Sequence, residues 1–121
     1  MTLFREAGDR TGEARVLINI GIDETELGRY EQAASHQQEA LALFRDIGER
    51  VQEPVALNGL GEVLFRTGCA DTARAHHAGA LRLASEADAP REQARAHSGL
   101  ARICQADGDP VQAPGTTGRK P

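Results

Sequence analysis

The segment LFRDIGER at residues 43–50 repeats the segment LFREAGDR at residues 3–10. Five of the eight positions are identical, and two of the others exchange Asp and Glu. The same step of 40 residues relates nine further pairs of identical residues, which begin at Glu13, Leu17, Gly21, Gly28, Ala33, His36, Ala40, Leu41 and Leu43. Self-similarity at a fixed period of about 20–50 residues indicates an array of stacked units.

Each copy carries the apolar spacing of two consecutive helices. Leu57, Leu60 and Leu64 recur at steps of three and four residues, which is the spacing of one face of an α-helix. A glycine is expected to end most of the helices, because a left-handed residue suits that position: Gly8 after a helix end at residues 2–7, and then Gly28, Gly48, Gly68 and Gly108. We therefore expect helices near residues 10–27, 30–47, 51–67, 70–87 and 91–107. Pro54 is expected to delay the start of the third helix or to kink it.

These elements predict an all-α fold, a solenoid of helical hairpins with about two and a half repeats of 40 residues. One domain at residues 1–110 holds the repeats, and residues 111–121 are expected to form a disordered tail. The residues expected in the core are Leu57, Leu60, Leu64, Ala73, Ala80 and Leu81. The end faces are expected to expose apolar side chains, which are Leu3, Phe4, Leu17 and Ile20 at the start and Leu100, Ile103 and Cys104 at the end.

Composition argues against several classes of partner. The chain has 121 residues, a net charge of −4 and 3% aromatic residues without Trp, which gives nucleic acid little charge or stacking surface. It has no run of apolar residues long enough to cross a bilayer and no signal peptide at its start, so we expect a cytoplasmic protein that binds no membrane. Cys69 and Cys104 are 35 residues apart and fit free thiols better than a disulfide.

The residues that carry chemistry do not form a catalytic or metal-binding pattern. His36 and His76 occupy equivalent positions one repeat apart, too far for one zinc ion, and fit packing or surface histidines better. His97 and Cys104 are two helical turns apart, which is too far for a nucleophile and its base. The segment NGLG at residues 58–61 lies inside a helix and is not a phosphate-binding loop. We therefore expect no enzyme activity, no catalytic residue, no metal and no cofactor.

The helical pattern resembles the tetratricopeptide repeat (TPR) family. In that family a first helix carries a large apolar residue, then Leu-Gly and a bulky residue, and the second helix carries small residues. The matching positions are Leu57, Leu60, Gly61, Leu64, Ala73 and Ala80 in one copy, and Leu17, Ile20, Gly21, Ala33 and Ala40 in the other. The chain departs from the family in its longer repeat, in Glu24 at the bulky position, and in Gln37 and His77 at the usual aromatic position. HQQEALALFRDIGER and ARAHHAGALRLA further resemble the repeats that end large actinobacterial transcriptional regulators.

The resemblance implies a scaffold that binds a peptide or partner domain on the concave face lined by the first helices. The candidate peptide-binding residues on these helices are Arg15, Asn58, Glu62, Arg66, Arg95 and Arg102. An amide such as that of Asn58 can hold a peptide backbone, and the arginines can pair with carboxylates. The same pattern also fits a solvated charged face without a special partner.

A second interpretation stays open, in which the array is a fragment of a larger regulator and mediates sensing or self-association. The chain opens with residues typical of the last turn of a second helix, and its last unit stops early. Two chains are then expected to form a homodimer through their terminal helices, and a marginally stable monomer is the alternative.

Overall fold

The computed structural model describes residues 7–106, and these form five helices with no strand among them. The helices are α1 (Ala7–Glu26), α2 (Tyr30–Ile47), α3 (Glu53–Arg66), α4 (Ala70–Glu86) and α5 (Pro90–Ala106). All five predicted helices are confirmed, with ends that differ from the expected ones by a few residues, and so is the all-α hairpin fold. The predicted tail at residues 111–121 and the glycine at 108 lie outside the described residues.

Left-handed residues end the helices, as the sequence predicts. Gly28, Gly48 and Gly68 have φ values of 81°, 76° and 89°. The N–H of Gly48 donates to the carbonyl of Arg45, which satisfies one of the last carbonyls of α2. At the next equivalent position Asp88 takes the left-handed conformation with φ 55°, and Asp is one of the few other residues that tolerate it.

Two predictions at helix starts have different outcomes. Gly8 does not end a helix, because it lies in the first turn of α1. Glycine is compatible with either hand of the backbone, so its presence alone does not mark a helix end. Pro54 lies in the first turn of α3, where its missing N–H is not needed, and α3 begins at Glu53, later than the uninterrupted pattern indicates.

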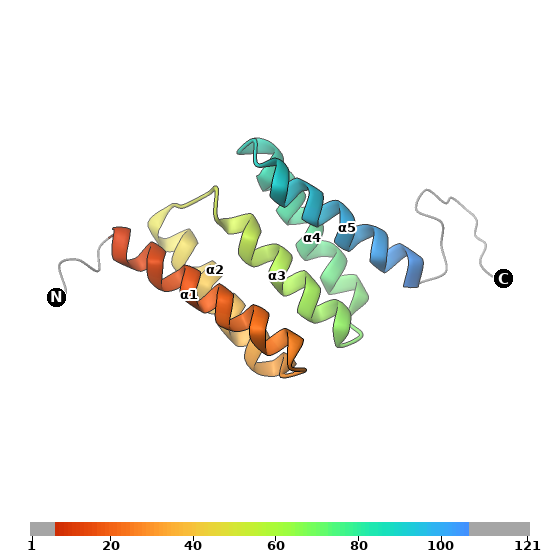
Figure 1. Cartoon of the computed structure of the whole chain (residues 1–121). Helices are drawn as coiled ribbons and strands as arrows, with labels where there is room; N and C mark the ends of the chain where they lie inside the picture. The colour runs from red at the N-terminus through yellow and green to blue at the C-terminus, as the bar shows by residue number, and fades with distance from the viewer. Residues whose placement is uncertain (1–6, 107–121) are drawn as a thin grey trace.

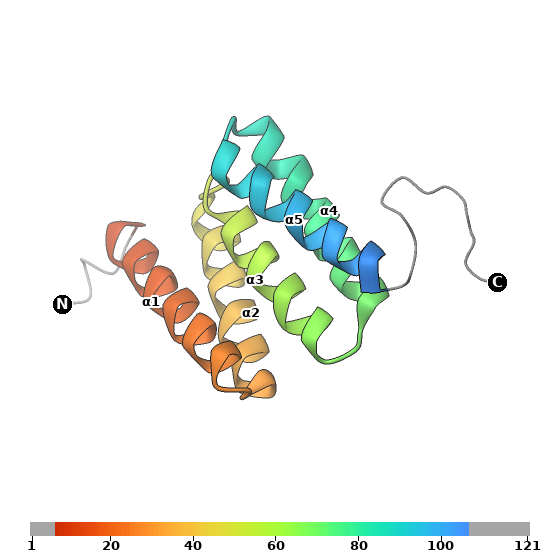
Figure 2. The same ribbon diagram turned by 45° about the vertical axis from the view of Figure 1, so that its right-hand side comes forward.

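The helices form two layers. α1, α3 and α5 lie side by side and share one face of the molecule, while α2 and α4 lie behind them (Figures 1 and 2). Each second helix packs against the first helix of its own hairpin and against the first helix of the next. This order places the exposed surface of the three first helices on one continuous face.

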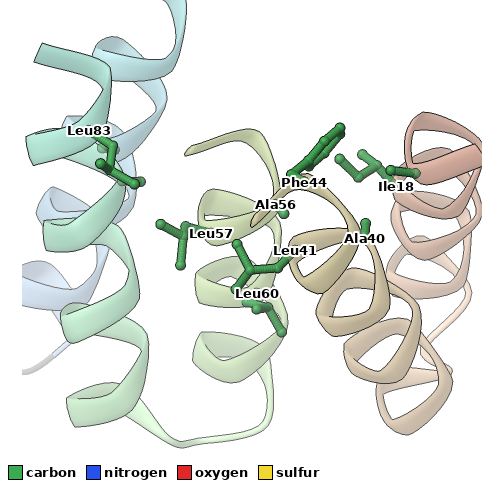
Figure 3. Close-up of a cluster of buried hydrophobic side chains, with 11 residues drawn as sticks. Ile18, Ala40, Leu41, Phe44, Ala56, Leu57, Leu60 and Leu83 are labelled. Atoms are coloured by element: carbon green, nitrogen blue, oxygen red, sulfur yellow. The ribbon is translucent and has the colours of Figure 1, made fainter. Parts of the chain in front are cut away.

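The core fills the space between the two layers (Figure 3). Its buried residues are Ala14, Ile18, Ala40, Leu41, Phe44, Ala56, Leu57, Leu60, Ala80, Leu83 and Ala96. The predicted burial of Leu57, Leu60, Ala73 and Ala80 is confirmed. Leu64 and Leu81 are only half-buried, so their prediction was wrong.

The end faces differ from the expected ones at the last helix. Ile20 on α1 is 39% exposed and Leu17 is half-buried, whereas Leu3 and Phe4 lie outside the described residues. Ile103 is fully buried, contrary to the prediction. Residue spacing places Ile103 on the apolar face of α5. It does not show which residues of that face α4 covers.

A polar side chain from each second helix is wedged between two first helices. A Cβ on Gly59 would lie 2.6 Å from the side chain of Gln37, and a Cβ on Gly61 would lie 2.5 Å from the ring of His77. Gly21 makes the same close approach to Gln37, and Gly99 makes it to His77. Both wedges and both glycine pairs are related by the 40-residue step, so this contact sets the spacing of adjacent hairpins.

Candidate functional site

The face shared by α1, α3 and α5 is hollowed at three places. The largest of these cavities, of about 500 Å³, is lined by the middle of α1 and by the starts of α3 and α5 with the turns before them, and Arg15 and Arg95 are in its lining. A second cavity of about 320 Å³ lies between α3 and α5 and includes Glu62 and Arg102. A third, of about 140 Å³, connects Glu62 on α3 with residues of α1. The structure thus brings Arg15, Glu62, Arg95 and Arg102 together around the cavities of one face.

Asn58 lies beneath this face rather than on it. It is 1% exposed. Its amide nitrogen donates to the backbone carbonyl and to Oε1 of Glu92, both at 3.1 Å. Since that nitrogen faces Glu92, Oδ1 faces Nδ1 of His77 at 2.8 Å and accepts a hydrogen bond from it. These hydrogen bonds join α3, α4 and α5. The side-chain amide of Asn58, which was predicted to hold a peptide, instead connects three helices of the fold.

Burial also changes the titration of His77. The loss of hydration on burial, together with the positive charges of Arg102 and Arg95, lowers the pKa of His77 below its usual value of 6.5, while Glu62 opposes this shift. The ring is therefore neutral at neutral pH, with its proton on Nδ1.

An ion-pair ladder runs across the face from α1 to α5. Arg66 lies 3.8 Å from Glu26 and 3.1 Å from Glu62. Arg102 makes two hydrogen bonds of 2.9 and 3.1 Å to the carboxylate of Glu62, and its guanidinium stacks over Phe65. Most of the charge on Arg66 and Arg102 is thus already balanced within the chain.

The carboxylate of Glu62 shows the effect of this ladder. Its partial burial by itself would raise the pKa, but the hydrogen bond and charge of Arg102, followed by those of Arg66, outweigh burial and hold the pKa below its usual value. Glu62 is therefore firmly ionised at neutral pH, and it serves first as the internal partner of two arginines.

The cations around the largest cavity are less well balanced. Arg95 pairs with Glu92 at 3.1 Å. Within residues 10–106, Arg15 on α1 and Arg91 on α5 have no hydrogen bond or ion pair to an acidic side chain. Sequence reasoning missed Arg91, because the first exposed position that spacing assigned to this face on α5 was Arg95. The two free guanidinium groups are both at the edge of the same cavity.

Two of the remaining histidines have separate partners, and the cysteines are unbonded to each other. Nδ1 of His36 lies 2.7 Å from a carboxylate oxygen of Glu24, and Nδ1 of His76 lies 2.9 Å from the carbonyl of Thr72. Cys69 and Cys104 are free thiols. In the part of the chain that the structure describes, no three His, Cys, Asp or Glu side chains come together as a metal site.

The comparison with known families identifies the repeat. The family model described as tetratricopeptide repeat matches residues 52–113, about half of the chain, so the chain belongs to the tetratricopeptide repeat family. A search of curated proteins and a search of solved structures each found no match. Repeats of this family generally mediate protein–protein interaction and are typically scaffolds without enzymatic activity. Within residues 7–106, no helix is both long enough and apolar enough to cross a bilayer.

Proposed function

We propose that this chain is a protein-interaction scaffold that binds a peptide or partner domain on the face of α1, α3 and α5. The observation that carries the proposal is the set of cavities on this face, since binding sites are concave and combine apolar surface with a few polar groups. The close approach of Gln37 and His77 to glycines of the first helices fixes how these helices are spaced beneath the face. Such preorganisation reduces the entropy lost on binding.

The test is to block the face and to measure binding. Peptides are first selected on the wild-type protein from a random twelve-residue display library. Ile22→Trp and Ser98→Trp fill two of the cavities and are expected to weaken binding of the selected peptides by about tenfold or more. Gln38→Trp, on the outer side of α2, is the matched control. Equal affinity for all four proteins, with unchanged melting temperatures, would exclude the proposed face.

A second candidate function rests on an exposed apolar stripe along α1. Val16, Ile20 and Leu27 are 56%, 39% and 66% exposed. The repeat equivalents of the first two, Ala56 and Leu60, are buried under α2 of the preceding hairpin. In this reading the array belongs to a larger TPR-containing transcriptional regulator in the cytoplasm and mediates sensing or self-association, with the exposed stripe of α1 as the surface that pairs two chains.

Self-association is tested by light scattering at micromolar concentration. A dimer that Ile20→Asp dissociates, while Arg82→Asp on α4 leaves it intact, supports this second function. A monomer at every concentration, with a cooperative thermal transition, would contradict it.

A further inference from the structure

The cavity at Arg15 and Arg91 combines free positive charge with an apolar floor. Its lining includes Ile18, Ile22, Val51, Val55 and Ala89. Ile22 is 41% and Val51 52% exposed, although side chains of this kind are usually covered. Among the described residues of the lining, Glu92 is the one carboxylate, and it is 8% exposed and bonded to Asn58 and Arg95.

The charges of this cavity stand out from the rest of the molecule. The chain as a whole has a net charge of −4, whereas the cavity carries Arg95, which is paired, and two arginines that have no acidic partner among residues 10–106. On the rest of the face, Glu26 and Glu62 neutralise Arg66 and Arg102. A ligand with carboxylates gains most at Arg15 and Arg91, because binding there breaks no ion pair within residues 10–106.

The arrangement of the three helices sets the order of groups in a ligand. Arg15 lies on α1 and Arg91 on α5, and the same lining includes Val51 in the turn before α3 and Val55 on α3. Packed helix axes are about 10 Å apart, so a segment that crosses from α1 to α5 spans on the order of 20 Å, or about six extended residues. The carboxylates must therefore lie on both sides of an apolar side chain, within a few residues of it.

We propose that the partner is an acidic protein segment that places a branched aliphatic or aromatic side chain on the Ile22–Val51–Val55 floor and carboxylates beside Arg15 and Arg91. This inference rests on the proposed function of the face and narrows it to one cavity and one ligand chemistry. It also assigns a binding role to Arg91.

The experiment uses the full chain and peptides selected from the random library, each labelled with fluorescein and titrated by fluorescence anisotropy. The selected sequences are expected to share Asp or Glu on both sides of Leu, Ile, Val or Phe. The Arg15→Glu/Arg91→Glu variant is expected to bind them about tenfold or more weakly. The Arg29→Glu/Arg82→Glu variant makes the same charge change in the α1–α2 turn and on α4, and it should bind them as wild type does.

A charge exchange separates recognition from a loss of structure. Peptides in which Lys replaces each Asp and Glu should bind the Arg15→Glu/Arg91→Glu variant more tightly than they bind wild type. The wild-type affinity should also fall with added salt, because exposed charge pairs are screened. Val51→Ser removes apolar surface from the floor of the cavity. It should weaken binding of the peptides but leave the salt dependence of their affinity in place.

Each contrary result has a distinct meaning. Neutral or basic selected peptides, or acidic ones indifferent to Arg15→Glu/Arg91→Glu, would overturn the acidic partner while leaving the proposed face intact. Failure of the library to yield any binder blocked by Ile22→Trp or Ser98→Trp would count against the face itself. A wild-type dimer that Arg15→Glu/Arg91→Glu dissociates would make a second copy of the chain the occupant and overturn the inference.

Discussion

Two polar side chains, Gln37 and His77, occupy the places where adjacent hairpins approach most closely. His77 is 3% exposed, and its ring lies between Gly61 of α3 and Gly99 of α5. A shift of the ring away from one glycine moves it toward the other. Gln37 has more freedom because its side chain is unbranched, and its buried Oε1 has no hydrogen-bond partner within the described residues.

Alanine at Gly61 or Gly99 should therefore destabilise the fold. Overpacking of this kind costs about 1–3 kcal/mol, which exceeds the helix propensity that alanine gains over glycine, about 1 kcal/mol. Gly12→Ala on α1 is the control, since a Cβ there meets nothing within 4 Å. This variant should therefore be stabilised by the higher helix propensity of alanine. Urea denaturation measures all three variants. Equal stabilisation of all three would show that the wedge does not limit the spacing of the hairpins.

The lowered pKa of His77 predicts an acid-sensitive fold. Below about pH 6.5 the unfolded chain protonates this histidine while the folded chain does not, so the free energy of unfolding falls as the pH falls. The stability that the neutral His77 contributes is fully present above the pKa of this histidine in the unfolded chain, and it is lost as the pH falls below that value. His77→Gln, which copies Gln37 of the preceding repeat, should reduce the fall in melting temperature between about pH 8 and pH 6. The same fall in wild type and variant would contradict this assignment.

At the scale of the helices, the ladder from Glu26 to Arg102 ties three first helices together. Its central carboxylate, Glu62, is 25% exposed, and Arg102 is 46% exposed. Exposure on this scale limits the coupling, so a double-mutant cycle of Glu62→Gln and Arg102→Met should give about 0.5–1 kcal/mol. The pair Arg50 and Glu86, which are 64% and 58% exposed, should give less. Equal coupling energies for both pairs would show that the ladder stabilises the fold no more than an exposed ion pair does.

Packing between α2 and α3 contributes more than the surface charges. Leu60 is 2% exposed and belongs to the core cluster with Leu41 and Phe44. Leu60→Ala should cost about 2–5 kcal/mol, the usual range for a truncated core leucine. Leu27→Ala, at a position that is 66% exposed, should change stability little. Thermal denaturation followed by circular dichroism distinguishes them, and a melt unchanged by Leu60→Ala would contradict the observed packing.

For the whole molecule, much of the fold follows from local signals in the sequence. The 40-residue repeat, the apolar spacing and the glycines at helix ends predict the five helices and their pairing. The errors have a common origin. Periodicity tells which face of a helix is apolar but not how far the next helix covers it, so Leu64 was placed too deep and Ile103 too near the surface.

The site was less accessible to sequence reasoning. Spacing placed Arg15, Glu62, Arg66, Arg95 and Arg102 on one face, but it contained no information on ion pairs between helices 40 residues apart, such as Glu62 with Arg102. The internal role of Asn58 likewise depends on Glu92 and His77, which other helices contribute. Arg91 becomes a candidate only because the start of α5 and the middle of α1 line the same cavity.

The central claim, that the face of α1, α3 and α5 binds a protein segment, is tested most directly by mapping a library-selected peptide on the 12.9 kDa chain by nuclear magnetic resonance. On titration with the peptide, the largest changes in backbone amide chemical shift should occur at Arg15, Ile22, Val51, Val55 and Arg95. Changes on the outer surface of α2 and α4 should be small. Shifts concentrated on α2 and α4 instead would contradict it.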